Sequence, residues 1–266
     1  MYARDDFERM ILNLAKGTSI NTIPATLYVG LLLGDPGDSG QYTEISYTNY
    51  ARQVITFTEP TAAGPGAHSI QNAAKITFPE SQESAGTVQF IGIFTSANAN
   101  TGTMLLYGDL DDDIAVTSGV SPIFQEGSIK YTLSGMIGST WRTRILNTLR
   151  GTPATGFTAY FGCASGNVES GGTEFSGNGY QRVQIPFSTP ANLDPSASKS
   201  PMAMNNSDAI VTPYATAQWG NWSHTVVYDA ATGGNPFYLS ARSQANMIYR
   251  GGACGYDTGD LILTID

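Results

Sequence analysis

The sequence predicts an all-β protein of two tandem β-sandwich or jelly-roll-like domains, each preceded by a short N-terminal α-helix. Two observations predict this fold class. Short runs of apolar and aromatic residues follow one another at close intervals, separated by Gly, Pro, Asn and Ser, as in sandwiches and barrels. The same series of segments then occurs a second time, later in the chain. We therefore expect one domain at residues 1–134 and a second, diverged domain at residues 135–266.

The duplication is visible in six segments that recur in the same order. "TEISYTNYAR" at 43–52 returns as "TEFSGNGYQR" at 173–182, an offset of 173 − 43 = 130. "ILNLAKGT" at 11–18 returns as "ILNTLRGT" at 145–152, an offset of 145 − 11 = 134. Small insertions in loops produce such drift, so we interpret the whole unit as duplicated. The other four pairs begin at residues 26 and 158, 57 and 187, 86 and 220, and 127 and 259.

Each unit begins with a segment whose apolar residues recur at helical spacing. Gly17 and Gly151 are expected to end the two helices. Carboxylates at the start of the first helix suit the positive end of the helix dipole, and Ser139 or Thr140 is the expected N-cap of the second. Each helix is expected to cover an edge or an open end of the sandwich. The apolar positions are Phe7, Met10, Ile11 and Leu14 in the first helix and Trp141, Ile145 and Leu149 in the second.

The rest of each unit is expected to form strands, because the segments are rich in β-branched and aromatic residues and are bounded by turn residues. Two polar connectors, 61–70 and 191–206, are expected to be surface loops. The expected strands of the first unit lie within 25–33, 52–57, 73–78, 87–94, 103–110 and 128–133, and the clearest of the second lie within 157–164 and 182–187.

The composition excludes some classes of partner. Only 13% of residues are charged, which indicates a surface rich in uncharged polar side chains that suits packing against other protein. The net charge of −9 argues against nucleic acid and against an anionic membrane surface, both of which need clustered Lys and Arg. No segment is predicted to span or insert into a membrane or to act as an export signal, so we expect synthesis in the cytoplasm.

Both cysteines, Cys163 and Cys254, lie in the second half. A disulfide needed for folding would be expected in both copies. We therefore expect reduced, buried thiols, with a pair that meets in space as the alternative.

Three patterns in the sequence are of kinds that can be associated with chemistry. Residues 37–40 read "GDSG", but both histidines lie downstream, so a tight turn is expected rather than a serine protease. Asp109, with Asp111, Asp112 and Asp113, has no counterpart in the second copy and is expected to form a solvated acidic turn rather than a metal site. No pair of carboxylates suits a glycoside hydrolase. We predict no enzyme activity, catalytic residue, cofactor or metal.

One set of three residues is present in both copies. We expect the Glu and the Arg to pair across a turn or between strands, and the Tyr to pack its ring and to hydrogen-bond through its hydroxyl. Residues shared by two copies report first on the shared fold, so we interpret the set as a structural signature. A binding site that occurs twice is the alternative. The residues are Glu44, Tyr50 and Arg52, with counterparts Glu174, Tyr180 and Arg182.

The order of these motifs resembles that of small proteins of tailed bacteriophages known as tail or tail-fibre proteins. The resemblance rests on residues 25–60, on Asn72 followed by "ITFPES", on "GTVQFIGIF" and on "GSIKYTL". Such proteins typically consist of one unit, and here the second unit is similar but diverged, with "AYFGCASGNV" in place of "LYVGLLLGDP". The resemblance implies a structural protein of the virion, with no catalytic residues.

The leading hypothesis is therefore a non-enzymatic component of a tailed-phage virion that self-associates and docks onto other virion proteins. It could be tail- or fibre-associated, a collar or baseplate connector, or a capsid decoration protein. Analogy favours a homo-oligomer such as a trimer. The alternative is a module that binds host-surface glycan, in which exposed aromatic rings stack on sugars; packing of the two Trp rings between sheets is the competing interpretation. The candidate aromatic residues are Trp219, Trp222, Tyr228 and Tyr238.

Overall fold

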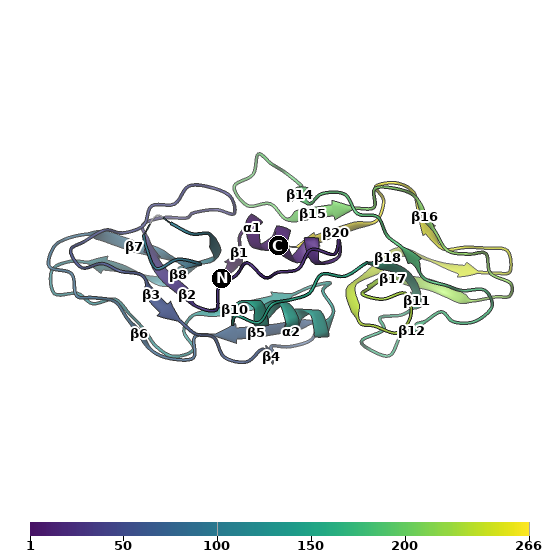
Figure 1. The fold of residues 1–266 in the computed structure, drawn as a ribbon, viewed down its shortest axis with the longest axis horizontal. Helices are drawn as coiled ribbons and strands as arrows, with labels where there is room; N and C mark the ends of the chain where they lie inside the picture. The colour runs from purple at the N-terminus through teal and green to yellow at the C-terminus, as the bar shows by residue number, and fades with distance from the viewer. Residues whose placement is uncertain (100, 266) are drawn as a thin grey trace.

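The computed structural model describes residues 1–99 and 101–265 and has an all-β architecture with two short helices (Figure 1). The predicted fold class is thus confirmed. The first repeat contains α1 (Asp5–Leu14) and strands β1 (Tyr2–Ala3), β2 (Leu27–Leu32), β3 (Gln53–Ile55), β4 (Thr61–Ala62), β5 (Ala67–Gln71), β6 (Ile76–Thr77), β7 (Gly86–Phe94), β8 (Met104–Val116), β9 (Ile123–Phe124) and β10 (Lys130–Ser134). The second contains α2 (Ser139–Thr148) and strands β11 (Tyr160–Ser165), β12 (Thr173–Glu174), β13 (Val183–Gln184), β14 (Ala191–Asn192), β15 (Met202–Asn205), β16 (Ile210–Val211), β17 (Gly220–Tyr228), β18 (Pro236–Ile248), β19 (Gly255–Tyr256) and β20 (Ile262–Ile265).

The two repeats have the same sheet topology. The large sheet of the first has the order β1-β8-β7-β2-β3, and that of the second has β12-β11-β17-β18 with β13 also paired to β11. A smaller sheet accompanies each: β10-β5-β4 in the first and β14-β15-β20 in the second. The central strands β2 and β11 are buried along most of their length, as expected for apolar runs with neighbours on both sides.

Both connectors expected to be loops instead form hairpins. The connector at 61–70 contains β4 and most of β5, which pair antiparallel through Thr61 and Ser69. The connector at 191–206 contains β14 and β15, with a longer tip between them. The prediction of loops was wrong because polar residues on an exposed strand pair resemble a loop when sequence is the only guide.

The helices lie where their periodicity predicts, and Gly17 and Gly151 end them with φ of 85° and 83°. The expected N-cap of α2 was wrong. Gly138 occupies the N-cap position, and the Ser139 N–H donates instead to the carboxylate of Glu169 at 2.6 Å. This side chain comes from a distant loop and supplies the acceptor that a local cap would provide.

Each helix packs on the small sheet of the other repeat. Helix α1 contacts β15 and β20 of the second repeat as well as β8 of its own, and α2 contacts β5 and β10 of the first repeat as well as β18 of its own. Both helices lie in the middle of an elongated molecule, with the two large sheets toward opposite ends (Figure 1). The expectation that each helix covers an edge or an open end of its own sandwich describes only a part of the arrangement, since each helix also packs on the small sheet of the other repeat. We call this arrangement the helix exchange.

Reciprocal contacts join the two repeats. Ile20 and Ala154 occupy equivalent positions because 154 − 20 = 134, and their backbones exchange hydrogen bonds of 2.8 and 3.0 Å. The basic residues that follow the helices make similar contacts with the other repeat. Lys16 donates to the carbonyl of Ser188 at 2.9 Å, and Arg150 donates to the carbonyl of Phe57 at 3.2 Å.

The "GDSG" segment is a turn that joins the repeats. The carboxylate of buried Asp38 accepts hydrogen bonds from the Tyr107 hydroxyl at 2.7 Å and from the Ser200 N–H at 2.8 Å. The Arg4 guanidinium donates to the Asp38 carbonyl at 2.8 Å. Nearby, the Met202 N–H donates to a helix α1 carboxylate across the same interface. One continuous hydrophobic core spans both repeats.

Asn72 anchors the small sheet of the first repeat and is fully buried. Its side-chain oxygen accepts from the Ile129 N–H at 2.8 Å, and its amide donates to the carbonyls of Ala74 and Gln125 at 2.9 and 2.7 Å. Asn206 makes the same three kinds of contact in the second repeat. Asn72 and Asn206 therefore also belong to the structural signature that the two repeats share.

Candidate functional site

The three residues predicted to pair in the first repeat form one hydrogen-bonded cluster. Glu44 lies beside β2, to which it is joined by a bridge to Leu32. Its Oε1 accepts hydrogen bonds from the Tyr50 hydroxyl at 2.7 Å and from Arg52 Nε at 2.9 Å, and its Oε2 accepts from Arg52 Nη2 at 2.7 Å. The carboxylate therefore holds the guanidinium in a two-point contact.

The cluster also binds backbone from two other segments. The Tyr50 hydroxyl accepts from the Leu31 N–H at 3.0 Å. Arg52 Nη1 donates to the carbonyls of Ser96 and Thr101, both at 2.9 Å, so it fixes the hairpin between β7 and β8. These contacts hold three parts of the repeat together: strand β2, the segment that contains the cluster, and the hairpin between β7 and β8.

Burial makes this first cluster inaccessible. The side chains of Arg52 and Glu44 are 0% and 1% exposed, and the guanidinium lies 3.5 Å above the Phe94 ring. Burial, with the negative charge of Glu44, raises the pKa of Tyr50. At Arg52 burial acts to lower the pKa, but the hydrogen bonds and charge of Glu44 outweigh it and raise the pKa overall. Both groups thus stay protonated, which suits a structural contact.

The second repeat contains the same cluster. Glu174 Oε1 accepts from the Tyr180 hydroxyl at 2.9 Å and from Arg182 Nε at 2.7 Å, and Oε2 accepts from Arg182 Nη2 at 2.6 Å. Arg182 Nη1 donates to the carbonyls of Ala230 and Gly233 at 2.7 and 2.6 Å. The Tyr180 hydroxyl accepts a strand N–H at 2.8 Å, and the guanidinium lies 3.2 Å from the centroid of an aromatic ring.

A glycine makes room for each cluster. A Cβ atom on Gly30 would lie 2.8 Å from Glu44 Oε1, and one on Gly162 would lie 3.1 Å from Glu174 Oε1. Real Cβ atoms rarely approach other atoms so closely. The two glycines occupy equivalent positions in β2 and β11, since 162 − 30 = 132. In the sequence, both glycines are visible only as members of predicted strands.

Two aromatic side chains of the first repeat are replaced by glycine in the second. Tyr42 packs on Phe94 with ring centroids 5.3 Å apart, and its hydroxyl lies 3.4 Å from the Arg52 guanidinium. Gly172 stands at the equivalent position, and Tyr228 stands where the first repeat has Phe94. A hydrogen bond joins the Tyr228 hydroxyl to Glu174, and burial raises the pKa of Tyr228. The second repeat thus has a tyrosine hydroxyl at the Phe94 position in place of the one at the Tyr42 position.

The second replacement is also compensated. Tyr47 packs on Tyr50 with ring centroids 5.3 Å apart. Gly177 stands at its equivalent position, and Trp219, which replaces Ala85, packs on the second cluster's tyrosine at 5.3 Å. In each case the glycine and the aromatic residue that compensates for it are far apart in the sequence. The fold is needed to see that they are neighbours.

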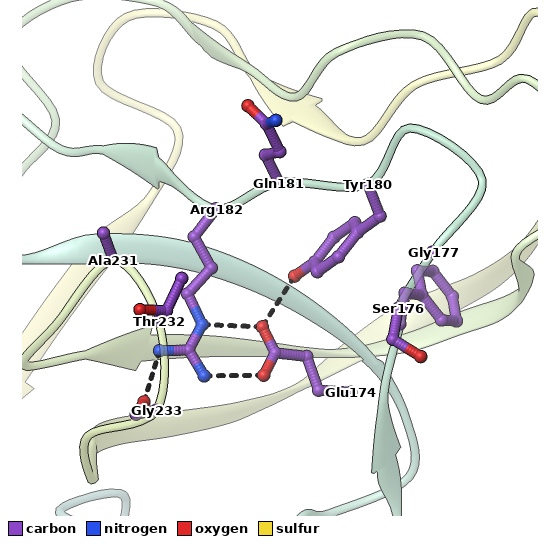
Figure 2. Close-up of a pocket in the computed structure, with 10 residues that line it drawn as sticks. Glu174, Ser176, Gly177, Tyr180, Gln181, Arg182, Ala231, Thr232 and Gly233 are labelled. Carbon is purple, nitrogen blue, oxygen red and sulfur yellow. Dashed lines mark hydrogen bonds and ion pairs between the residues drawn. The ribbon is translucent and has the colours of Figure 1, made fainter.

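The second cluster faces an open cavity of about 420 Å³ (Figure 2). The Glu174 side chain is 22% exposed, compared with 1% for Glu44, so the second cluster is the more open of the two. Figure 2 shows the ion pair and the tyrosine hydroxyl together, with the loop that contains Thr232 and Gly233 on one side. Polar groups of the lining include Glu174, Ser176, Tyr180, Gln181, Arg182 and Thr232.

The aromatic residues proposed to stack on glycans lie mostly inside the protein. Trp222, Tyr228 and Tyr238 are 4%, 5% and 1% exposed, so their ring faces are not presented to solvent. Trp222 packs between Phe161 and β19, as the competing interpretation expected. Trp219 is half-buried, and it packs on the tyrosine of the second cluster. These burial values do not suit sugar stacking.

The remaining candidates do not assemble a reactive centre. Asp109, Asp111, Asp112 and Asp113 are exposed along β8. Across residues 1–99 and 101–265, no group of three or more His, Cys, Asp or Glu side chains is placed to hold a metal ion. The two cysteines are free and buried. Burial, and the hydrogen bond of the Cys163 thiol to Cys254, raise the pKa of Cys163.

The model of one protein family, podophage GP4 fiber I protein gp80, matches residues 3–132 and again residues 137–264. The chain belongs to this family. Membership confirms the predicted relation to the fibre proteins of tailed bacteriophages, tandem duplication included, and makes the chain a structural component of the virion. No curated protein matches the sequence. In the described part of the chain, neither helix has the length and apolar character needed to cross a membrane.

Proposed function

We propose that this fibre-family protein is a non-enzymatic connector that docks other virion proteins at its two ends. The helix exchange is the observation that carries the proposal. It buries the middle of the molecule in a shared core and leaves the two large sheets and their loops toward opposite ends (Figure 1). A molecule built in this way can hold two neighbours at a fixed distance and orientation, as a connector requires.

The two ends differ in charge, which suits two different neighbours. Residues 1–134 contain 6 Lys and Arg against 14 Asp and Glu, a net charge of −8, whereas residues 135–266 contain 7 against 8, a net charge of −1. Asp111 and Asp113 on β8 are replaced by Ser243 and Ala245 on β18. Opposite potentials favour contact and like potentials oppose it, so the two repeats should select different partner surfaces.

Exposed aromatic residues also distinguish the ends. Tyr214 and Tyr249 are 72% and 64% exposed in the second repeat. The first repeat has Glu80 and Thr117 at the equivalent positions. Exposed tyrosine is enriched at protein interfaces, whereas Glu is depleted there. We therefore expect the second repeat to make the more apolar of the two contacts.

The clusters support a structural rather than a catalytic role. Each charged group is held by a partner of opposite charge and by backbone carbonyls, so neither carboxylate is positioned as a general acid or base. We propose that Glu44, Tyr50 and Arg52, and their counterparts in residues 135–266, have a structural role. In each repeat they hold a central strand and a distant hairpin together.

The test is to locate the protein on purified virions. Particle cryo-microscopy, with mass spectrometry of the same particles, should show the chain between two other structural proteins, one on each repeat. Light scattering after size exclusion measures self-association of the purified chain. A monomer that is missing from purified particles would contradict the proposal.

A further inference from the structure

The far end of each repeat is formed by the same two segments. We call residues 77–89 with 110–120 the first end, and the equivalent residues 211–223 with 242–252 the second end. Matching backbone contacts join the segments: the Ser81 N–H donates to the Val120 carbonyl at 2.9 Å, and the Ala215 N–H donates to the Gly252 carbonyl at 2.8 Å. Strand β6 leads into the first end and β16 into the second, and Figure 1 places these strands toward opposite ends of the molecule.

The two ends carry opposite charge on this shared backbone. The first end contains five carboxylates and no Lys or Arg, whereas the second contains two Arg and no Asp or Glu. Their net charges are therefore −5 and +2. The charged residues are Glu80, Glu83, Asp111, Asp112 and Asp113 in the first end, and Arg242 and Arg250 in the second.

These charges have no partner of opposite charge within residues 1–99 and 101–265, because none of the seven takes part in an ion pair there. Glu83 and Asp113 accept hydrogen bonds from neutral groups. Arg250 is exposed, and Arg242 is half-buried with its guanidinium 3.3 Å from the centroid of an aromatic ring. Both ends can therefore gain ion pairs from a neighbour of opposite charge.

The second end also presents apolar surface. Tyr214 and Tyr249 are exposed, as are Val211 and Met247. The first end has smaller or charged side chains at the equivalent positions. Tyrosine, methionine and arginine are enriched at protein interfaces. The second end thus has the composition of a docking surface for an acidic partner.

We propose that the second end of one copy docks onto the first end of another copy. Opposite potentials favour this contact, whereas two first ends, each with five carboxylates, repel each other. A contact between unlike surfaces on opposite sides of an elongated molecule extends copies into an open row. The inference rests on the proposed docking role of the two ends and names one neighbour; the outermost ends of a row remain available to other virion proteins.

The test is sedimentation equilibrium of the full chain over a series of concentrations. Exposed ion pairs contribute little each and are screened by salt, so we expect a weak contact. The average mass should rise above that of one chain, with a dissociation constant of about 100 µM or tighter in about 20 mM salt. Raising the salt to about 500 mM should weaken the contact at least about fivefold.

Two variants separate the ends, and each takes the residues that the other repeat has at the same positions. Either variant alone should self-associate at least about tenfold more weakly than the native chain. An equal mixture should form a heterodimer with close to native affinity, because each variant keeps the end that the other has lost. The second-end variant combines Tyr214→Glu, Tyr249→Thr and Arg250→Ser, and the first-end variant combines Asp111→Ser, Asp112→Gln and Asp113→Ala.

Two controls lie outside both ends and should associate as the native chain does. Leu193→Ser removes an exposed apolar side chain. The second control removes three exposed carboxylates, through Asp208→Asn, Asp257→Asn and Asp260→Asn. A thermal melt of each variant shows that the fold is intact.

The proposal is overturned if the native chain keeps the mass of one copy throughout the series, if either end variant associates as well as the native chain, or if the mixture stays monomeric. Weakening by the controls equal to that by the end variants would also overturn it. A native chain that is monomeric in solution but present on purified particles would refute this contact and leave the virion role intact, so the two failures are distinguishable.

Discussion

Removing the arginine of each cluster should cost far more in the first repeat than in the second. In Arg52→Met the Glu44 carboxylate, whose side chain is 1% exposed, loses the guanidinium that pairs with it and stays buried. Breaking a buried ion pair in this way costs about 3–5 kcal/mol. The freed carbonyls of Ser96 and Thr101 add little, because both residues are at the surface, where water can replace the guanidinium. In Arg182→Met the partner Glu174 is 22% exposed and can be hydrated, so we expect about 1–3 kcal/mol.

Urea unfolding measures this difference. The fluorescence of Trp141 and Trp222, both buried, reports the transition, and circular dichroism checks that the sheets unfold with it. The double variant Glu44→Gln with Arg52→Met is the internal control, because it also removes the buried negative charge and should recover a part of the loss. Equal losses for the two single variants, or a loss of less than about 1 kcal/mol for Arg52→Met, would refute the reasoning from burial.

Three further outcomes follow from the buried polar groups. Asn72→Ala leaves the buried Ile129 N–H without its acceptor and should lower the free energy of unfolding by about 1–3 kcal/mol in urea; a loss of less than about 0.5 kcal/mol would contradict it. The pKa of Tyr50 is raised in the folded state, so its contribution to stability is present below the unfolded value of about 10 and is lost as pH rises above it; Tyr50→Phe should flatten the fall in stability between about pH 9.5 and 11. Cys163 and Cys254 should not react with DTNB at pH 8 until the chain unfolds, and rapid labelling of the native protein would contradict their burial.

The residues of the two clusters could be predicted from the sequence because the two copies can be compared with each other. Glu44 and Arg52 recur at the same spacing in the second copy, and opposite charges with a repeated spacing indicate a pair. Their hydrogen bonds to the distant hairpin were not predictable, since nothing in the local pattern joins residue 52 to the carbonyl of Thr101. The glycines at 30 and 162 are explained only once the carboxylate is seen beside them.

The helix exchange could not be predicted from the sequence, for a different reason. Ile11 and Ile145 predict an apolar helix face, but two similar sheets are available to each helix. Periodicity fixes which residues of a helix are buried and does not determine which copy buries them. The same limit applies to the cavity, whose walls come from Gly177 and from a hairpin more than fifty residues away.

Hydrogen exchange in two matched variants tests the helix exchange most directly. Ile11→Ala shortens a fully buried side chain on α1, and Ile145→Ala does the same at the equivalent position on α2. The structure predicts a crosswise result: Ile11→Ala should reduce amide protection in β15 and β20 of the second repeat, and Ile145→Ala should reduce it in β5 and β10 of the first. Loss of protection confined in each case to the small sheet of the helix's own repeat would contradict the exchange and the rigid connector that rests on it.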